Sequence, residues 1–237
     1  VCDDYLRTFR NAPEKYGLKL SDRQLMCAPI QSDEGKSYLG AMAAAANFAW
    51  ANRQVIAGLT ESAFLKALNI SSESLKFSLL YDVAHNIAKI ENHFVDGNNK
   101  KVVVHRKGAT RSFPENHEQL PESLKTIGQP VLIPGDMGRY SYISVGAEKS
   151  MTDTFGSTCH GAGRVKSRKQ AIRDSERINV FKEIERRGIH LRAKGKNTVA
   201  EEMPDAYKDV TDVVEVMHQE QISMKIAKLK PLAVIKG

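Results

Sequence analysis

The chain has 237 residues and a mass of 26.3 kDa, which is enough for one sizeable hydrophobic core or two small ones. Hydrophobic residues make up 41% and charged residues 27%, a balance that excludes a fibrous or extensively disordered chain. The longest apolar stretch, residues 41–51, is too short and too rich in alanine to span a membrane, so we expect no membrane partner. The three cysteines form no CxxC pair, so we expect an intracellular protein of the cytoplasm, or of the nucleus in a eukaryote.

The net charge of +7 is concentrated in two windows. Residues 100–111 contain five Lys or Arg and no acid, and residues 164–177 contain six Lys or Arg and two acids. Together these windows carry +9, so the rest of the chain is slightly acidic. Clustered positive charge attracts a polyanion in a salt-dependent way. A solvated helix face is an equally good interpretation of the second window alone.

The N-terminal third is predicted to be mainly helical. Ser32 and the two acids after it predict the start of a helix that runs through residues 38–54 and packs against the core. Thr60 predicts the cap of a second helix that ends at Leu68. Residues 75–81 alternate and then turn apolar, which is typical of a strand.

The central part of the chain predicts strands followed by helices. The Asp96-Gly97 pair between two apolar runs predicts a hairpin. Residues 128–138 and residues 140–145 predict two further strands, bounded by Pro and Gly. Residues 169–187 predict one or two helices that end at Gly188.

Toward the C-terminus, apolar residues recur at helical spacing from Val210 to Met217, so a helix is expected after Asp209. The apolar tail, residues 231–237, predicts a strand of the buried type. Strands and helices are mixed without a regular βαβ order. The predicted fold class is therefore α+β, with mixed and antiparallel sheets and packed helices.

The densest chemistry lies in residues 159–168, CHGAGRVKSR. Its two glycines let the backbone approach a ligand and direct N–H groups at it, and its arginines can bind phosphate oxygens. Because a neutral imidazole can attack a phosphorus whose charge is neutralised, His160 is the candidate nucleophile. A Gly-rich turn with a structural histidine is the alternative. Cys159 is a weaker rival, since adjacent side chains of an extended segment point in opposite directions.

Two other segments could contact a metal ion or phosphates. In YDVAHN, residues 81–86, His85 stands at the end of an apolar strand, where it could bind a metal or be an ordinary core residue. No second ligand stands at a metal-motif interval. HRKGATRS, residues 105–112, predicts either a loop that contacts phosphates or a solvated turn. Its cations are Arg106, Lys107 and Arg111.

Three further segments could line a nucleotide pocket. PGDMG, residues 134–138, could form a backbone wall or be a bare turn. Tyr207 could stack on a base or be a buried core residue. Lys236 follows an apolar strand, so we expect the tail that carries it to dock rather than fray.

Taken together, these segments resemble one protein family, and they do so in the same order along the chain. The motifs are CHGAGR, YDVAHN, HRKGATR, GQPVLIPG-x-MG, AYKDV and KPLAVIKG. They are similar to the C-terminal half of the RtcB RNA ligases, from about Cys27 to Gly237. The resemblance implies an RtcB-like fold in which residues 1–237 form the C-terminal, GMP-carrying part and the metal-binding half lies upstream.

The resemblance implies an RNA ligase that uses GTP and manganese in tRNA splicing and RNA repair. Such an enzyme joins a 2′,3′-cyclic phosphate or 3′-phosphate end to a 5′-hydroxyl end. The cyclic phosphate is opened first. A histidine takes GMP from GTP and passes it to the RNA 3′-phosphate, and the 5′-hydroxyl then displaces GMP. The implied partners are tRNA halves, an archease-type activator and a tRNA ligase complex.

The resemblance also implies roles for single residues, by motif match. His160 is the residue that carries GMP, His85 is a manganese ligand, and Tyr207 stacks on guanine. Arg164 and Arg168 are expected to hold RNA or triphosphate oxygens. The implied GMP contacts are Asn86, Pro134, Gly135, Asp136, Met137, Ser141, Gly161, Ala162, Gly163 and Lys236.

Two departures from the family pattern matter. Asp136 stands where the family has Ser or Thr, and a carboxylate there would repel a phosphate unless it points away or binds a metal. The family's other manganese ligands and its guanine-reading acid lie upstream, so this chain alone is expected to be an incomplete enzyme. Asp136 also favours the alternative function, a module that binds RNA ends and nucleotide without chemistry.

Overall fold

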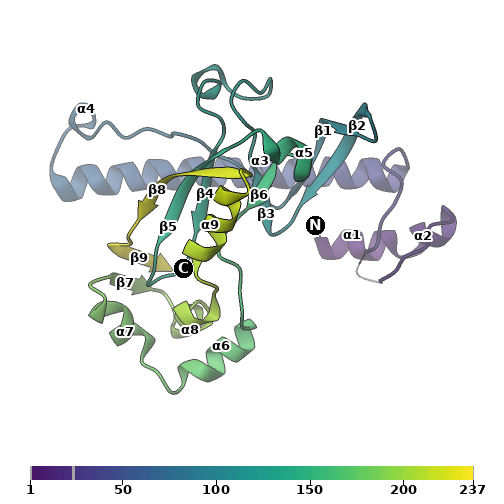
Figure 1. Cartoon of the computed structure of the whole chain (residues 1–237). Helices are drawn as coiled ribbons and strands as arrows, with labels where there is room; N and C mark the ends of the chain where they lie inside the picture. The colour runs from purple at the N-terminus through teal and green to yellow at the C-terminus, as the bar shows by residue number, and fades with distance from the viewer. Residues whose placement is uncertain (1, 23–24, 237) are drawn as a thin grey trace. The chain divides into compact units, whose positions relative to one another are not determined.

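The computed structural model describes residues 2–22 and 25–236. The chain divides into an N-terminal unit, residues 1–82, and a C-terminal unit, residues 83–237. Helices make up the first unit, whereas the second combines short helices with small sheets (Figure 1). Among these described residues, three of the four sheets are antiparallel and one is parallel. This mixture confirms the predicted α+β class.

The N-terminal unit is built around one long helix. Aromatic rings of Tyr5, Phe9 and Tyr38 meet edge to face at centroid distances of 5.3–5.7 Å, which fixes the first short helices against the start of the long one. Glu34 accepts hydrogen bonds from Lys15 and Tyr16 at the same place. The elements are α1 (Cys2–Thr8), η1 (Phe9–Asn11), α2 (Ala12–Lys15), α3 (Asp33–Leu68) and α4 (Ser72–Leu75).

The predicted break near Thr60 is wrong, because α3 runs without interruption from Asp33 to Leu68. Ser32 caps it as predicted, since its hydroxyl accepts the N–H of Gly35 at 3.1 Å. The hydroxyl of Thr60 does not cap a helix and instead donates to the carbonyl of Ile56 at 2.8 Å. A Ser or Thr inside a helix can satisfy its hydroxyl four residues back, so the residue type alone does not mark a start.

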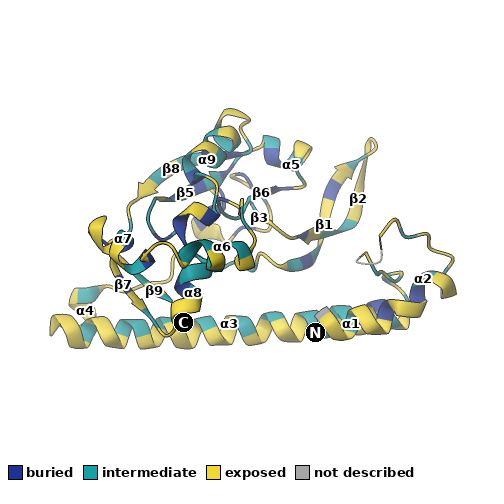
Figure 2. Cartoon of the chain, turned by 90° about the horizontal axis from the view of Figure 1, so that it is seen from below, coloured by how far each residue is buried: buried dark blue, intermediate teal, exposed yellow. Residues whose placement is uncertain are grey.

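Two more predictions for this unit are wrong. Among the described residues of α3 only Gly35 is buried, so residues 41–51 pack against no core within this unit (Figure 2). Its apolar residues are spread around the helix and give it no single apolar stripe. Residues 75–81 form no strand, because α4 ends at Leu75 and Lys76 adopts a positive φ of 51°.

The C-terminal unit contains four small sheets. The predicted hairpin is confirmed: β1 and β2 pair antiparallel around Asp96 and Gly97, which have φ values of 51° and 76°. The two strands predicted at 128–138 and 140–145 are confirmed as β4 and β5. The sheets are β1 (Ile87–Val95) with β2 (Asn98–Arg106), β3 (Ala109–Arg111) with β6 (Ser157–Cys159), β4 (Pro130–Pro134) with β5 (Ser141–Gly146) and β8 (Ser223–Leu229), and β7 (His190–Ala193) with β9 (Ala233–Lys236).

Short helices cover these sheets. The prediction for residues 169–187 is confirmed as two helices, α6 and α7, followed by Gly188 at φ 74°. The helix predicted after Asp209 is confirmed as α9, and the carboxylate of Asp209 accepts the N–H of Thr211 at 2.8 Å. The helices are η2 (Glu122–Leu124), α5 (Lys149–Asp153), α6 (Arg168–Ser175), α7 (Val180–Arg186), α8 (Lys196–Glu201), η3 (Pro204–Ala206) and α9 (Val210–Gln219).

Two apolar clusters form the core of this unit. In the first, Ile133 of β4 packs with Val210 and Val214 of α9, and Ala162 joins them from the loop after β6. The second joins α6, α7, α8 and β7, with Ile184 fully buried near its middle. Because the loop residue Ala162 belongs to the first cluster, burial of α9 against the sheet also holds the loop that follows β6.

The C-terminal tail forms a strand as predicted, but it is not of the buried type. β9 pairs parallel with β7 from Ala233 to Lys236, yet the side chain of Ile235 is 84% exposed. Its apolar run therefore marks an edge strand rather than a core strand. No helix within residues 2–22 and 25–236 combines the length and the apolar character needed to cross a membrane.

Candidate functional site

A cavity of about 700 Å³ lies in the C-terminal unit beside His160, a size typical of sites for small ligands. All predicted site residues line it except His85, Asn86, Arg106 and Arg111. Most of the predicted residues of its wall come from the end of β4 to the start of β5 and from the loop after β6, and the others are Lys107 after β2, Arg168 of α6, Tyr207 after η3 and Lys236 of the C-terminal tail. Its lining is Lys107, Pro134, Gly135, Asp136, Met137, Ser141, His160, Gly161, Ala162, Gly163, Arg164, Arg168, Glu202, Tyr207, Pro231, Ala233, Val234 and Lys236.

The loop after β6 is held closely against the end of β4. The N–H of Ala162 donates to the carbonyl of Pro134 at 3.0 Å. A Cβ at Gly161 would lie 3.2 Å from the same oxygen, so this close approach favours glycine. Gly163 has a φ of 74°, a conformation that an L residue rarely adopts. The two glycines therefore allow the loop to bend around the cavity, as the sequence indicates.

His160 is half-buried at the start of this loop, and its ring stacks on that of His85 with centroids 5.0 Å apart. Burial and the nearby charges of His85 and Lys107 hold the pKa of His160 below its usual 6.5. The imidazole is consequently neutral at neutral pH, the form in which its nitrogen is a nucleophile. Burial raises the pKa of the neighbouring Cys159 thiol, which makes Cys159 a poor competitor.

His85 lies in a bend before β1 and not at the end of a strand, contrary to the prediction. Its side chain and that of Asn86 are exposed. Within the described part of the chain, no three His, Cys, Asp or Glu side chains come together as metal ligands. His85 and His160, whose rings stack, therefore do not make up a complete metal site among the described residues.

An acidic residue that sequence reasoning missed connects the aromatic and basic side chains of the wall. Glu202 accepts a hydrogen bond from the hydroxyl of Tyr207 and lies 3.3 Å from Arg164 and 3.8 Å from Lys236. Burial and the contact with Glu202 raise the pKa of Tyr207 to about 12. Glu202 stands beside Glu201 in the sequence, and nothing in the pattern distinguishes the two acids.

Tyr207 is also fixed from one side of its ring. The guanidinium carbon of Arg164 lies 4.8 Å from the ring centroid, and its Nη1 donates to the Tyr207 hydroxyl at 2.8 Å. The two residues also pair as an isolated β-bridge. The Tyr207 ring also packs against both apolar clusters, so the stacking of a base on it stays a prediction.

The carboxylate of Asp136 is turned away from the cavity. Its side chain is fully buried, accepts the N–H groups of Gly138 and Arg139, and forms an ion pair with Arg139 at 2.6 Å. The guanidinium of Arg139 also donates to the carbonyls of Pro204 and Tyr207. Of the alternatives left by the sequence, the structure favours the one in which Asp136 points away and its charge is neutralised.

Of the five basic residues predicted to contact phosphates, Lys107, Arg164 and Arg168 line the cavity, and Arg106 and Arg111 do not. Lys107 and Arg168 are exposed and line the cavity, Arg168 at the first residue of α6. Arg111 lies outside it, with its guanidinium over the ring of Phe113. Arg106 corrects the prediction: its side chain is 1% exposed and paired with Glu91 at 2.8 Å, so it does not face RNA.

Comparison with known proteins decides the family. A family model described as "tRNA-splicing ligase RtcB" matches residues 1–237. The chain belongs to the RtcB family. This confirms the resemblance drawn from the ordered motifs, and the RtcB match covers both units of the chain.

Curated relatives named tRNA-splicing ligase RtcB agree with the family model. The RtcB of Archaeoglobus fulgidus is 53% identical over 237 residues, and that of Methanococcus maripaludis is 51% identical over 237 residues. Each alignment covers 100% of this chain but 49% of the relative. The chain therefore spans about half the length of these RtcB relatives.

Proposed function

We propose that this chain is the GMP-carrying part of an RNA ligase, with His160 as the nucleophile. The observation that carries the proposal is the position of a neutral, half-buried imidazole at the head of a loop that lines the cavity. The relatives' name, tRNA-splicing ligase, supports RNA ends as the substrate class.

The cavity suits a guanine nucleotide. Its volume of about 700 Å³ accommodates one, and the cations Lys107, Arg164 and Arg168 lie on its wall beside backbone that can approach phosphates. Tyr207 lines the same cavity, where its ring would stack on the base. In this arrangement Lys236, Ser141 and residues 134–137 would surround the base and ribose, and Asn86 would approach from outside the wall.

In the proposed first step, an imidazole nitrogen of His160 attacks the α-phosphorus of GTP. A nitrogen–phosphorus bond forms, and the bond to the bridging oxygen breaks, so pyrophosphate leaves with the electron pair. The cations on the cavity wall would neutralise the developing charge, and the glycine loop would direct N–H groups toward the same oxygens.

The second and third steps transfer GMP and join the RNA. An oxygen of the RNA 3′-phosphate, formed from a 2′,3′-cyclic phosphate by hydrolysis where needed, attacks the phosphorus held on His160. The nitrogen–phosphorus bond breaks and the RNA ends in a phosphoanhydride to GMP. The oxygen of the 5′-hydroxyl then attacks the RNA phosphorus, GMP leaves, and the hydroxyl proton passes to solvent.

The described residues do not form a manganese site by themselves, so no step is assigned to a metal. His85 is the residue that would contribute a ligand, beside His160. Further ligands would come from the part of the relatives that lies beyond this chain. Within this proposal, tRNA halves are the intracellular substrate, and an archease-type activator and a tRNA ligase complex are the partners.

The test is transfer of GMP from α-labelled GTP, with manganese, to a protein of the relatives' full length that contains these residues. We expect a covalent label on His160 that is lost in His160→Ala. The Cys159→Ala variant should keep the label, because the Cys159 thiol takes no part in GMP transfer. Circular dichroism checks the fold of both variants. A label that persists in His160→Ala would refute the assignment. Residues 1–237 alone are expected to take no label.

The alternative of a binding module without chemistry rested on a repulsive Asp136. Since Arg139 and two N–H groups neutralise that carboxylate, this support is lost. The binding-module alternative would be favoured if a protein of the relatives' full length bound RNA in a salt-dependent way and took no covalent label.

A further inference from the structure

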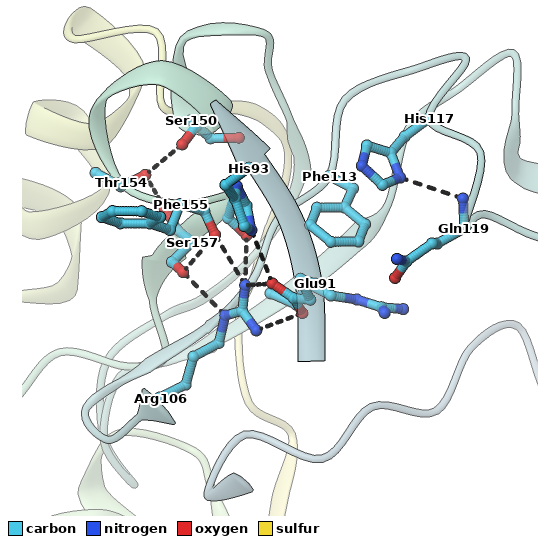
Figure 3. A network of polar contacts seen from close by, with 12 residues as sticks. Glu91, His93, Arg106, Phe113, His117, Gln119, Ser150, Thr154, Phe155 and Ser157 are labelled. Atoms are coloured by element: carbon cyan, nitrogen blue, oxygen red, sulfur yellow. Dashed lines mark hydrogen bonds and ion pairs between the residues drawn. The ribbon is translucent and has the colours of Figure 1, made fainter. Parts of the chain in front are cut away.

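A buried ion pair joins the two strands of the β1–β2 hairpin, between Glu91 of β1 and Arg106 of β2. Nη1 and Nη2 of Arg106 each donate to one oxygen of Glu91 at 2.8 Å (Figure 3). Both side chains are 1% exposed. Burying a charged pair costs solvation energy that its attraction barely offsets, so such a pair is weak evidence for a purely stabilising role.

The remaining donors of Arg106 reach a segment far along the chain. Nε donates to the hydroxyl of Ser157 at 2.9 Å, and Nη2 donates to the carbonyl of Phe155 at 2.9 Å. Phe155 and Gly156 both have positive φ, at 52° and 59°. The guanidinium therefore holds a turn whose backbone conformation is costly for a residue with a side chain.

Glu91 is held from its other side by His93. The Nε2 of His93 lies 3.0 Å from Oε2 of Glu91, and its ring meets the edge of Phe155 at 5.3 Å (Figure 3). The side chain of His93 is 1% exposed. Glu91, His93 and Arg106 thus form one network with the turn at residues 155–156, and this network connects β1 and β2 to the start of β6.

This network joins the two strands that lead into the cavity. Ser157 is the first residue of β6, which ends at Cys159, directly before His160. Arg106 is the last residue of β2, directly before Lys107, which lines the cavity. The next strand after Lys107 is β3, and it pairs with β6 over three residues, from Ala109 opposite Cys159 to Arg111 opposite Ser157. Three residue pairs give this ladder few hydrogen bonds, and the contacts of Arg106 with Phe155 and Ser157 hold the start of β6 from a second side.

We propose that Arg106, oriented by Glu91, is a positioning residue that fixes His160 relative to Lys107. This inference rests on the proposed function, because it concerns the same nucleophile. Arg106 touches neither the cavity nor a substrate. It acts by holding the turn at Phe155 and Ser157. This contact keeps β6 in a single register on β3 and so fixes the position of the His160 imidazole.

The kinetic test compares Arg106→Lys and Glu91→Gln with a core variant in a protein of the relatives' full length. Arg106→Lys keeps the charge but cannot donate to Glu91 and Ser157 at once. We expect the rate of GMP transfer to His160 to fall about 10- to 100-fold, since small misplacements of a nucleophile have effects of this size. The KM for GTP should stay within about twofold, because the wall residues are unchanged.

The matched control is Leu124→Ala, a buried residue of η2 that belongs to neither apolar cluster and does not line the cavity. It destabilises the C-terminal unit without touching the Arg106 network. If the control lowers the melting temperature as much as Arg106→Lys, its transfer rate should stay within about twofold of wild type. Equal rate losses in the two variants at equal melting temperature would overturn the proposal.

Hydrogen exchange provides a readout that needs no catalysis. Arg106→Lys should speed amide exchange in residues 157–160 at least tenfold while β7, residues 190–193, exchanges as in wild type. Unchanged exchange in 157–160, or a uniform increase in both segments, would overturn the positioning role. If wild-type protein takes no GMP, the proposed function fails, and exchange still decides the role of Arg106.

Discussion

Asp136 provides the sharpest test of how the cavity wall is built. Its carboxylate is fully buried, whereas Arg139 keeps 26% of its side chain exposed. Replacing Asp136 by Ala removes the partner of Arg139 and the acceptor of two N–H groups, those of Gly138 and Arg139. The same guanidinium donates to the carbonyl of Tyr207, so the wall near the proposed base site loosens with it.

The magnitude follows from these contacts. Removing one partner of a fully buried ion pair costs roughly 3–5 kcal/mol, and the partial exposure of Arg139 reduces this to about 2 kcal/mol. The turn N–H groups, which can rotate only slightly toward water, add about 1 kcal/mol. A total near 3 kcal/mol corresponds to a fall of about 6–12 °C in the melting temperature of a unit of this size. Asp136→Asn, which keeps one oxygen for the N–H groups, should lose about half as much.

The assay combines thermal unfolding with the KM for GTP in the labelling reaction. If the carboxylate is neutralised as the structure shows, Asp136→Ser lowers the melting temperature and does not lower the KM. The competing view, in which the charge repels the nucleotide, requires the opposite pattern. A KM that drops severalfold in Asp136→Ser at an unchanged melting temperature would refute the neutralised state of this carboxylate.

Two further predictions concern ionisation. Burial would raise the pKa of Glu91, but hydrogen bonds from Arg106 and His93 outweigh it and hold the pKa below 4.5. The ion pair therefore stabilises fully above about pH 4.5 and loses its effect as the pH falls through the lowered pKa. Urea unfolding should show Glu91→Gln less stable than wild type at pH 7, by a margin that shrinks below pH 4.5; a margin independent of pH contradicts this. Because burial raises the pKa of Cys159, iodoacetamide at pH 7.5 should alkylate the exposed Cys27 at least tenfold faster than Cys159, and equal rates would count against a protected Cys159.

Local sequence signals located most of the cavity wall. Gly161 and Gly163 indicated a loop that bends around a ligand, and a close approach and a positive φ account for them. Asp96-Gly97 and Asp209 placed a hairpin and a helix start correctly, because their preferences are set within a few residues. Such features depend on backbone sterics and short-range hydrogen bonds, which a single sequence displays directly.

The errors arose where distant residues decide the outcome. Thr60 carries a capping side chain, yet its hydroxyl bonds within a continuous helix. Arg106 looks like its neighbour Lys107 in the sequence, and only the buried Glu91 on the paired strand turns it inward. Glu202 was missed for the same reason, since its partners come from three separate segments. No local sequence pattern predicts such tertiary partners.

The parallel pairing of β9 with β7 places Lys236 on the wall of a cavity that is also lined by His160, the proposed nucleophile, 76 positions earlier in the chain. During synthesis at about 5–20 residues per second, His160 would thus leave the ribosome several seconds before the wall can close. A nascent or prematurely terminated chain would expose the histidine loop without the strand that completes its pocket. Under the proposed function, a chain that stops before β9 would bind guanine nucleotide poorly, because the wall segment that carries Lys236 would be absent.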